Sequence, residues 1–289
     1  FFARFLLYNL RSLMRSLLNL IRSLLKFAIP RWCHYIFTPF QLYLCSPLVS
    51  SNLNSPEHRI YVGPNHRLTL SQALMLQLEL SKSIRRFGWL GNYYEFGCFH
   101  GGSLIMCGQL IKYFSIFYKE FKDFKIFAFD SFEGLPENKK GDPKDPVWIN
   151  GEFYGSLEQV KRNVAEYRIN NIEYIKGFYE NSLTEELAEK MKECPPSIIY
   201  IDVDMYSSTI TVLNWIDKIA LPGTIIYFDD VWATGNHPES GEQKAIIEYN
   251  DLNTTRGFLT EDPTSYGSKT VFRFLLKDPE KNAQFKGYE

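Results

Sequence analysis

Residues 93–103 read YYEFGCFHGGS, and this stretch decides how the rest of the chain is interpreted. An apolar run that ends in a carboxylate and then breaks into Gly97, Gly101 and Gly102 predicts a strand, a tight turn and then a helix. Glycines suit such a turn because the backbone passes close to a ligand there, where a Cβ atom would intrude. The helix expected after the turn points its positive end at it. The stretch therefore predicts a pocket of the nucleotide-binding kind, although such a turn can also serve packing alone.

The next apolar run, KIFAFDSFEGLPE, predicts a second strand that ends at Asp130. An acid about 20 residues or more beyond a glycine turn is placed to accept hydrogen bonds from ribose hydroxyls. The turn reads GCFHGG, however, and not the GxGxxG of dinucleotide-binding proteins. An NAD-dependent oxidoreductase is therefore the weaker hypothesis, and we keep it as an alternative.

Carboxylates follow two further runs that are typical of buried strands. SIIYIDVD ends in Asp202 and Asp204, and TIIYFDD ends in Asp229 and Asp230. Alternation along a strand would point Asp202 and Asp204 to the same side. Adjacent parallel strands would then bring all these acids to one rim, where open α/β sheets bind ligands. Crowded carboxylates repel one another unless a cation neutralises them, and oxygen ligands suit Mg²⁺.

Four segments together, YEFGCFHGGS, FDSFEGLPE, IYIDVDMYSST and LPGTIIYFDD, resemble the macrocin O-methyltransferase family. The resemblance covers residues 59–276 and does not reach the first fifty-odd residues. Members of this family are class I enzymes that use S-adenosylmethionine to methylate sugar hydroxyls with the help of a divalent metal. The resemblance implies an α/β, Rossmann-like class I methyltransferase fold. Its features are a mostly parallel seven-stranded sheet, helices on both faces and an antiparallel hairpin near the C-terminus, here expected from residues 258–260 and 270–276.

The resemblance also implies roles for particular residues. It makes Asp202, Asp229 and Asp230 the ligands of Mg²⁺ and Asp204 the general base. The residues expected to bind S-adenosylmethionine are Glu95, Gly97, Phe99, Gly101, Gly102, Ser103, Asp130, Ser131 and Asp202. The expected activity is methyl transfer to a hydroxyl of a sugar or of a glycosylated small molecule.

Three other segments border the expected pocket. Residues 69–87 have helical periodicity, and in the family a helix just before the first strand packs over the cofactor. Residues 132–155 form a long loop rich in Pro, Lys and Asp, which we interpret as a lid over the acceptor. Residues 172–179, IEYIKGFY, predict the third strand and an exit loop near the adenine ring.

The composition indicates two parts of different character. Apolar residues make up 45% and charged residues 22% of the 289 residues, which are values of a globular protein. We expect one methyltransferase domain over residues 57–289. Residues 1–56 contain no Asp or Glu, and their basic residues are Arg4, Arg11, Arg15, Arg22, Lys26 and Arg31. We therefore expect residues 1–56 to contact a different environment from the one around the domain.

Residues 1–29 predict a basic amphipathic helix that ends at Pro30. Its apolar stripe is too interrupted by charge to span a bilayer. Three hypotheses remain for it: peripheral contact with an anionic membrane surface, association with another helix, as in a homo-oligomer, and a targeting peptide. The chain begins at Phe1 and not at Met, so the natural start of the protein can lie upstream. Residues 32–56 predict an irregular connector.

The remaining features narrow the partners and the compartment. Five scattered cysteines without CxxC spacing fit a reduced compartment, and we expect a cytoplasmic protein. The histidines show no zinc-site spacing. No basic patch with interleaved aromatics is visible in the domain, so we expect a small-molecule sugar or glycoside acceptor and no nucleic acid. A non-catalytic, membrane-associated protein that retains the fold is a further alternative, against which the intact rim acids count.

Overall fold

The computed structural model describes residues 91–117, 121, 123–144, 148–231, 239–261 and 271–285. The basic helix and the connector predicted within residues 1–56, and the helix predicted over residues 69–87, lie outside this part of the chain. Within the described ranges, no helix combines the length and the apolar character needed to cross a membrane.

Seven strands form one sheet in the order β3-β2-β1-β4-β5-β7-β6. The pairs from β3 through β5 are parallel, whereas β7 runs antiparallel to both β5 and β6. The strands are β1 (Asn92–Phe96), β2 (Ile126–Asp130), β3 (Ile172–Lys176), β4 (Pro196–Ile201), β5 (Ile225–Phe228), β6 (Gly257–Glu261) and β7 (Val271–Leu276). The predicted seven-stranded, mostly parallel sheet with an antiparallel C-terminal hairpin is confirmed.

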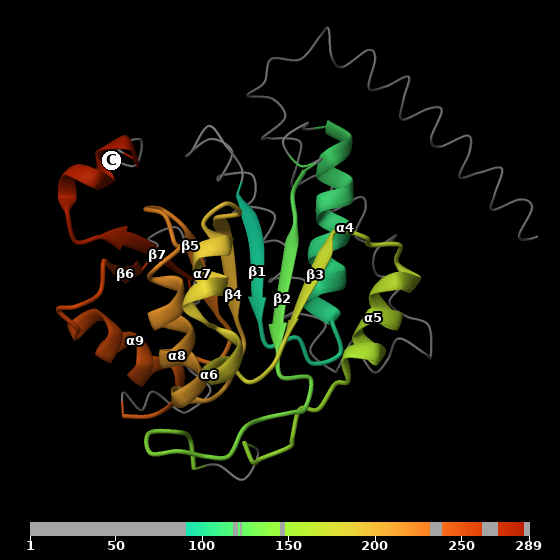
Figure 1. The fold of residues 1–289 in the computed structure, drawn as a ribbon, viewed down its shortest axis with the longest axis horizontal. Helices are drawn as coiled ribbons and strands as arrows, with labels where there is room; N and C mark the ends of the chain where they lie inside the picture. Colours follow the sequence, from blue (N-terminus) through green and yellow to red (C-terminus); the bar gives the residue numbers. More distant parts are fainter. Residues whose placement is uncertain are drawn as a thin grey trace, which may run out of the picture. The chain divides into compact units, whose positions relative to one another are not determined.

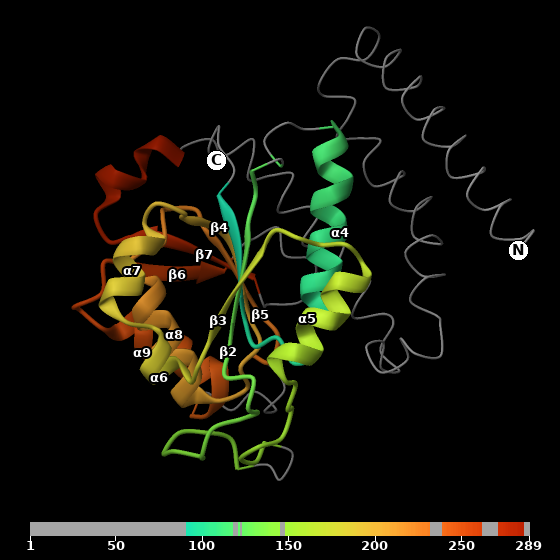
Figure 2. The same cartoon turned by 45° about the vertical axis from the view of Figure 1, so that its right-hand side comes forward.

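Helices cover both faces of this sheet, as predicted. Figure 1 and Figure 2 show α4 and α5 on one side and α6, α7, α8 and α9 on the other. The helices are α4 (Gly102–Phe117), α5 (Leu157–Glu166), α6 (Tyr179–Ser182), α7 (Glu185–Met191), α8 (Tyr206–Ile216) and α9 (Gly241–Asp251), followed by a 3₁₀ helix, η3 (Pro279–Phe285). Side-chain caps fix two of the starts, because Ser156 accepts from the Gln159 N–H and Thr184 from the Leu187 N–H. The short helices α6 and α7 have no counterpart among the predicted elements.

The central strands are buried on both faces, which explains why they read as continuous apolar runs. Every residue of β4 is buried, and in β1 and β2 the Phe96 and Phe129 rings stack with centroids 4.5 Å apart. Trp215 of α8 meets both rings edge-on. Parallel pairing places the carboxyl ends of β1, β2, β4 and β5 at one rim of the sheet, which is where such sheets bind ligands.

Candidate active site

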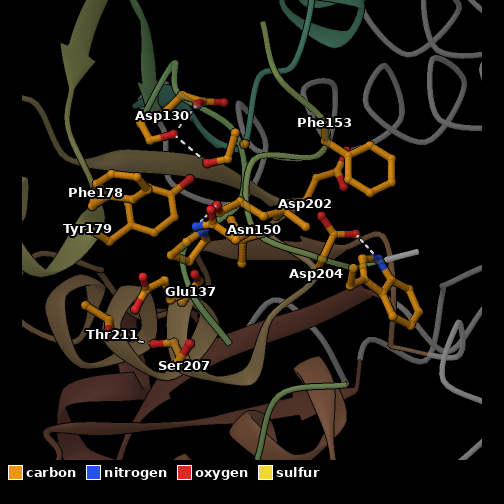
Figure 3. A pocket seen from close by; sticks show the side chains of 18 of the residues that line it. Asp130, Glu137, Asn150, Phe153, Phe178, Tyr179, Asp202, Asp204, Ser207 and Thr211 are labelled. Atoms are coloured by element: carbon orange, nitrogen blue, oxygen red, sulfur yellow. Dashed lines mark hydrogen bonds between the residues drawn. The ribbon is translucent and has the colours of Figure 1, made fainter. Parts of the chain in front are cut away.

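A pocket of about 820 Å³ opens at this rim. Its volume lies toward the upper end of the roughly 300–1,000 Å³ range of ligand sites, so it has room for a cofactor beside an acceptor. The predicted site residues on its wall are Gly97, Phe99, Asp130, Ser131, Asp202, Asp204, Asp229 and Asp230. Figure 3 shows Asp130 on the side of Phe178 and Tyr179, and Phe153 on the side of Asp202 and Asp204. Phe178 and Tyr179 follow β3 and are expected near the adenine ring. They thus lie beside Asp130, which is expected to bind the ribose.

Four predicted cofactor residues, Glu95, Gly101, Gly102 and Ser103, are not on the wall of this pocket. Glu95 is fully buried, and its carboxylate accepts hydrogen bonds from Ser103 Oγ at 2.6 Å and from the Tyr93 hydroxyl at 2.7 Å. Burial raises the pKa of Glu95 to about 8, although both hydrogen bonds oppose the shift. Glu95 therefore ties the end of β1 to the start of α4, and cofactor contact by these residues stays a prediction.

Gly97 lies where the ends of two strands almost touch. Its φ is +86°, and a Cβ atom built on it would lie 1.7 Å from the main-chain oxygen of Asp202. The Asp202 N–H donates to the Phe96 carbonyl at 2.9 Å, which locks the two strand ends together. The sequence predicts a glycine that makes room for a ligand. In the structure the nearest obstacle is the backbone that carries Asp202.

Asp130 organises the same turn from β2. Its Oδ2 accepts from the Cys98 N–H and its Oδ1 from the Phe132 N–H, each at 2.6 Å. Burial raises the pKa of Asp130, and these backbone donors hold the shift back. Asp130 Oδ1 also accepts from the Ser131 hydroxyl at 3.5 Å, and the carboxylate lines the pocket, where a ribose hydroxyl could replace this long bond. Gly97 and Asp130 line one part of the pocket, and a glycine turn beside a buried acid fits the binding of S-adenosylmethionine.

Three carboxylates form a tight group on the wall of the pocket. Asp202, Asp204 and Asp230 each offer an oxygen within 4.8 Å of the other two. Burial raises the pKa of Asp230 to about 8, with the neighbouring Asp204 adding to the shift. Burial also raises the pKa of Asp202 well above its ordinary value, and nearby carboxylates, Asp229 first, add to it. Hard oxygen donors in this arrangement fit a divalent cation such as Mg²⁺.

The reason predicted for the alignment of Asp202 and Asp204 is wrong. Strand β4 ends at Ile201, so neither acid lies on a strand and alternation cannot orient them. Asp204 instead adopts a left-handed backbone with φ of +58°, just before α8 begins at Tyr206. Asp is one of the few residues with a side chain that visits this region readily. A local turn, and not the pleat of the strand, turns Asp204 back toward Asp202.

Asp229 is not one of the three acids whose oxygens all lie within 4.8 Å of one another, although it lines the same pocket and its charge acts on Asp202. Its Oδ1 accepts from the Tyr200 hydroxyl at 3.0 Å and from the Tyr227 hydroxyl at 3.2 Å. These tyrosines face each other from β4 and β5, with ring centroids 4.9 Å apart. Two donors on one oxygen fix the carboxylate, and its predicted role as a metal ligand stays a prediction.

The loop expected to act as a lid contributes a folded wall to the pocket. Asp142 accepts from both the backbone N–H and the hydroxyl of Ser207, at 2.7 and 2.9 Å, which ties the loop to the first turn of α8. Trp148 is buried beside Leu135 and Met205, and its indole N–H donates to Asp204 Oδ1 at 2.7 Å. Trp148 has no predicted role in the site, because nothing in the sequence links a loop tryptophan to an acid 56 positions away.

The parallel sheet, the glycine turn and the acids at its rim define a class I methyltransferase. The model of the macrocin-O-methyltransferase family (TylF) matches residues 69–253, which is well over half of the chain, and the chain therefore belongs to this family. It is an S-adenosylmethionine-dependent O-methyltransferase. The match favours this activity over an NAD-dependent oxidoreductase and over a non-catalytic protein.

Solved structures agree with the fold. The crystal structure of CalS11, a calicheamicin methyltransferase, aligns with a TM-score of 0.57 at 19% identity over 83% of this chain and 94% of CalS11. The O-methyltransferase NovP aligns with a TM-score of 0.54 at 19% identity over 71% of this chain and 79% of NovP. No curated protein matches the sequence.

Proposed function

We propose that this enzyme methylates a hydroxyl of a sugar or of a glycosylated small molecule, with a divalent cation, Mg²⁺, at the acid cluster and Asp204 as the general base. The observation that carries the proposal is the group of three carboxylates within 4.8 Å of one another. It lies on the wall of the same pocket as Gly97 and Asp130, the residues that fit the cofactor. A cation site and a cofactor site that share one pocket are what metal-assisted methyl transfer requires.

Asp202 and Asp230, with Asp229 as the family resemblance implies, would hold the cation. When bound, the cofactor supplies the methyl group and the cation lowers the pKa of the acceptor hydroxyl. Asp204 then accepts the hydroxyl proton, a task that needs a carboxylate held in one orientation. The Trp148 indole N–H fixes that orientation by its bond to Asp204 Oδ1.

The acceptor side of the pocket combines apolar rings with polar groups. Phe153 of the loop over residues 132–155 is 43% exposed, and its ring meets that of Phe99, a residue expected to contact the cofactor, edge to face with centroids 6.1 Å apart. The side chains of Asn150 and Glu137 line the same pocket and offer hydrogen-bonding groups. A few polar groups placed among apolar rings can orient a sugar, which has both apolar ring faces and hydroxyls. This wall supports a glycosidic acceptor.

The proposal is tested by turnover with labelled S-adenosylmethionine on a panel of nucleotide sugars and glycosides. We expect a labelled methyl ether on one sugar hydroxyl, loss of turnover in EDTA, and recovery when Mg²⁺ is added in excess. Unchanged turnover in EDTA would exclude the cation. Labelling of a nitrogen or of a non-sugar hydroxyl alone would exclude the acceptor class.

We further propose that residues 1–29 act apart from catalysis, as a peripheral contact with an anionic membrane on the cytoplasmic side. The family match begins at residue 69, downstream of the proposed boundary between residues 1–56 and 57–289. The uncompensated basic residues of this segment support a surface of opposite charge as its partner. Association of two such helices in a homo-oligomer is the competing outcome, which the vesicle experiment described below distinguishes.

A further inference from the structure

Glu242 is a buried acid that the mechanism above does not use. It lies in the first turn of α9 and is only 1% exposed. Its Oε2 accepts from the main-chain N–H of Asp230 at 2.9 Å. Its Oε1 is buried too and finds no hydrogen-bond partner among the residues that the structure describes.

A buried carboxyl oxygen without a partner is unfavourable, because it has lost its water and gained nothing in exchange. Buried polar atoms in folded proteins are nearly always satisfied, so such an exception calls for an explanation. The N-terminal end of α9 favours a negative charge there, but that field supplies no hydrogen bond to Oε1. An unfilled partner site beside Oε1 explains it.

The surroundings of Glu242 point to a cation as that partner. Glu242 is bonded to the main chain of Asp230, and its charge contributes to the raised pKa of Asp202. It therefore lies next to the group formed by Asp202, Asp204 and Asp230. Within the described ranges, no Lys, Arg or His forms an ion pair with any of these four acids. Within these ranges no cationic side chain is therefore paired with the four acids, and a bound metal ion could take that place.

We propose that Glu242 is a positioning residue of the cation site, which holds the main chain of Asp230 with one oxygen and adds its own charge to the binding of the divalent cation with the other. The inference rests on the cation in the proposed function. It adds an acid from α9 to a centre that otherwise draws its acids from the ends of β4 and β5. Outer groups of this kind tune metal affinity by orienting the ligands and by their charge.

The test is calorimetric titration of Mn²⁺ into the full chain without cofactor or acceptor. Glu242→Gln keeps the volume of the side chain and an oxygen that can accept from the Asp230 N–H, so the variant isolates the charge. We expect it to bind Mn²⁺ about 10–100-fold more weakly than wild type. Glu248→Gln is the matched control on the same helix, because Glu248 is half-exposed and bonds to Tyr206, and we expect wild-type affinity.

Thermal melting gives a second readout that does not need activity. Without metal, Glu242→Gln is expected to melt close to the wild-type temperature, because it exchanges a buried oxygen without a partner for an amide nitrogen at the same place and keeps the bond to the Asp230 N–H. When Mn²⁺ is added, the melting temperature of the variant should rise less than that of wild type, because a ligand that binds more weakly stabilises the folded protein less. If wild type and Glu242→Gln bind Mn²⁺ with equal affinity and show an equal rise in melting temperature, the role of Glu242 is wrong, while the proposed function still stands. A wild-type protein that binds no Mn²⁺ would instead overturn the cation in the proposed function.

Discussion

The indole N–H of Trp148 and the carboxylate of Asp204 are joined by a hydrogen bond of 2.7 Å. Trp148 comes from the long loop after β2, and Asp204 from the turn between β4 and α8. Burial of Trp148 against Leu135 and Met205 holds the donor in place. The loop, which lines the pocket, is thereby connected to the acid proposed to remove the proton.

Replacing Trp148 by Phe tests this connection, because Phe keeps an aromatic ring in the loop and removes the N–H. We expect kcat to fall by about 10–100-fold, the equivalent of a hydrogen bond to a charged group worth about 1.5–3 kcal/mol. The KM for S-adenosylmethionine should change little. Steady-state kinetics with a confirmed acceptor gives both numbers.

Trp215→Phe is the matched control. Trp215 is also buried, and its indole N–H also makes one hydrogen bond, to the Thr184 carbonyl, but Trp215 does not line the pocket. The control should lose stability and keep its kcat. If both variants lose activity equally, the effect of Trp148 is one of folding and not of positioning.

Gly97 can be compared with Gly151, because the two have almost the same backbone. Their φ values are +86° and +82°, yet a Cβ on Gly97 meets the Asp202 carbonyl, whereas a Cβ on Gly151 meets nothing within 4 Å. Gly151→Ala should therefore lower the free energy of unfolding by about 1–2 kcal/mol, which is the strain of a left-handed backbone at alanine. Gly97→Ala should cost clearly more and weaken S-adenosylmethionine binding.

Chemical denaturation and calorimetry with the cofactor measure the two effects of the glycine variants. Equal losses of stability in both variants, with unchanged cofactor affinity, would mean that the close approach of the two strand ends does not shape the pocket.

The fold was predictable because its central strands are buried on both faces and are therefore apolar throughout. β4 shows this most clearly, since all of its residues are buried. The glycine turn was predictable because Gly97 and Gly101 adopt φ values of +86° and +85°, a conformation that favours glycine, directly after an apolar strand. In both cases a physical constraint acts on residues that are neighbours in sequence, and so it leaves a local pattern.

The details of the site escape such patterns because they depend on long-range contacts. Asp204 is oriented by a left-handed turn and by Trp148, 56 positions away, and neither follows from the pattern of SIIYIDVD. Glu242 reads as an ordinary acid in the first turn of a helix, and only the fold shows that it is buried against Asp230. Asp229 and Asp230 are adjacent acids in the sequence, and only the fold shows that Asp229 accepts from Tyr200 and Tyr227 while Asp230 belongs to the group of three acids.

Glu95 makes the stability of the fold depend on pH. Burial raises its pKa in the folded protein from an ordinary 4.5 to about 8, so between these values the folded state binds more protons than the unfolded state. The contribution of Glu95 is therefore favourable at low pH and is lost as the pH rises through about 8. Glu95→Gln removes this titration.

We expect the stability difference between wild type and Glu95→Gln to shift in favour of the variant as the pH is raised from about 5 to about 9. Urea denaturation at both pH values measures it. A difference that is constant across this range would show that Glu95 ionises in the folded protein as it does in the unfolded chain.

Residues 1–29 should bind vesicles that contain anionic lipid, and this binding should weaken with salt, because each basic side chain near the surface contributes about 1 kcal/mol. Sedimentation with anionic and with neutral vesicles measures it. Deletion of these residues should abolish the binding and leave turnover intact. If no vesicle binding is found and deletion of the segment instead converts a concentration-dependent dimer to monomers, the segment serves helix association.

The roles of Asp202 and Asp204 can be separated by replacing each with Asn. Asn keeps the shape of the side chain, tolerates the left-handed backbone of Asp204, and leaves an oxygen that can accept from Trp148. As a general base, Asp204 is needed only when the proton leaves, so Asp204→Asn should lower kcat by roughly 10²–10⁴-fold while cofactor affinity stays nearly unchanged. Asp202→Asn should lose the cation itself and respond only to a much higher Mg²⁺ concentration.

Kinetics and Mn²⁺ calorimetry on both variants decide between these roles, because Asp204 also lies within the group of three acids. A general base can be lost without loss of the cation, so Asp204→Asn should retain most of its Mn²⁺ affinity. If it loses that affinity as completely as Asp202→Asn, then Asp204 is a ligand and the proton leaves by another route. If it turns over as fast as wild type on a confirmed acceptor, the methyl transfer needs no base at this position, and the orientation of the two substrates alone explains the rate.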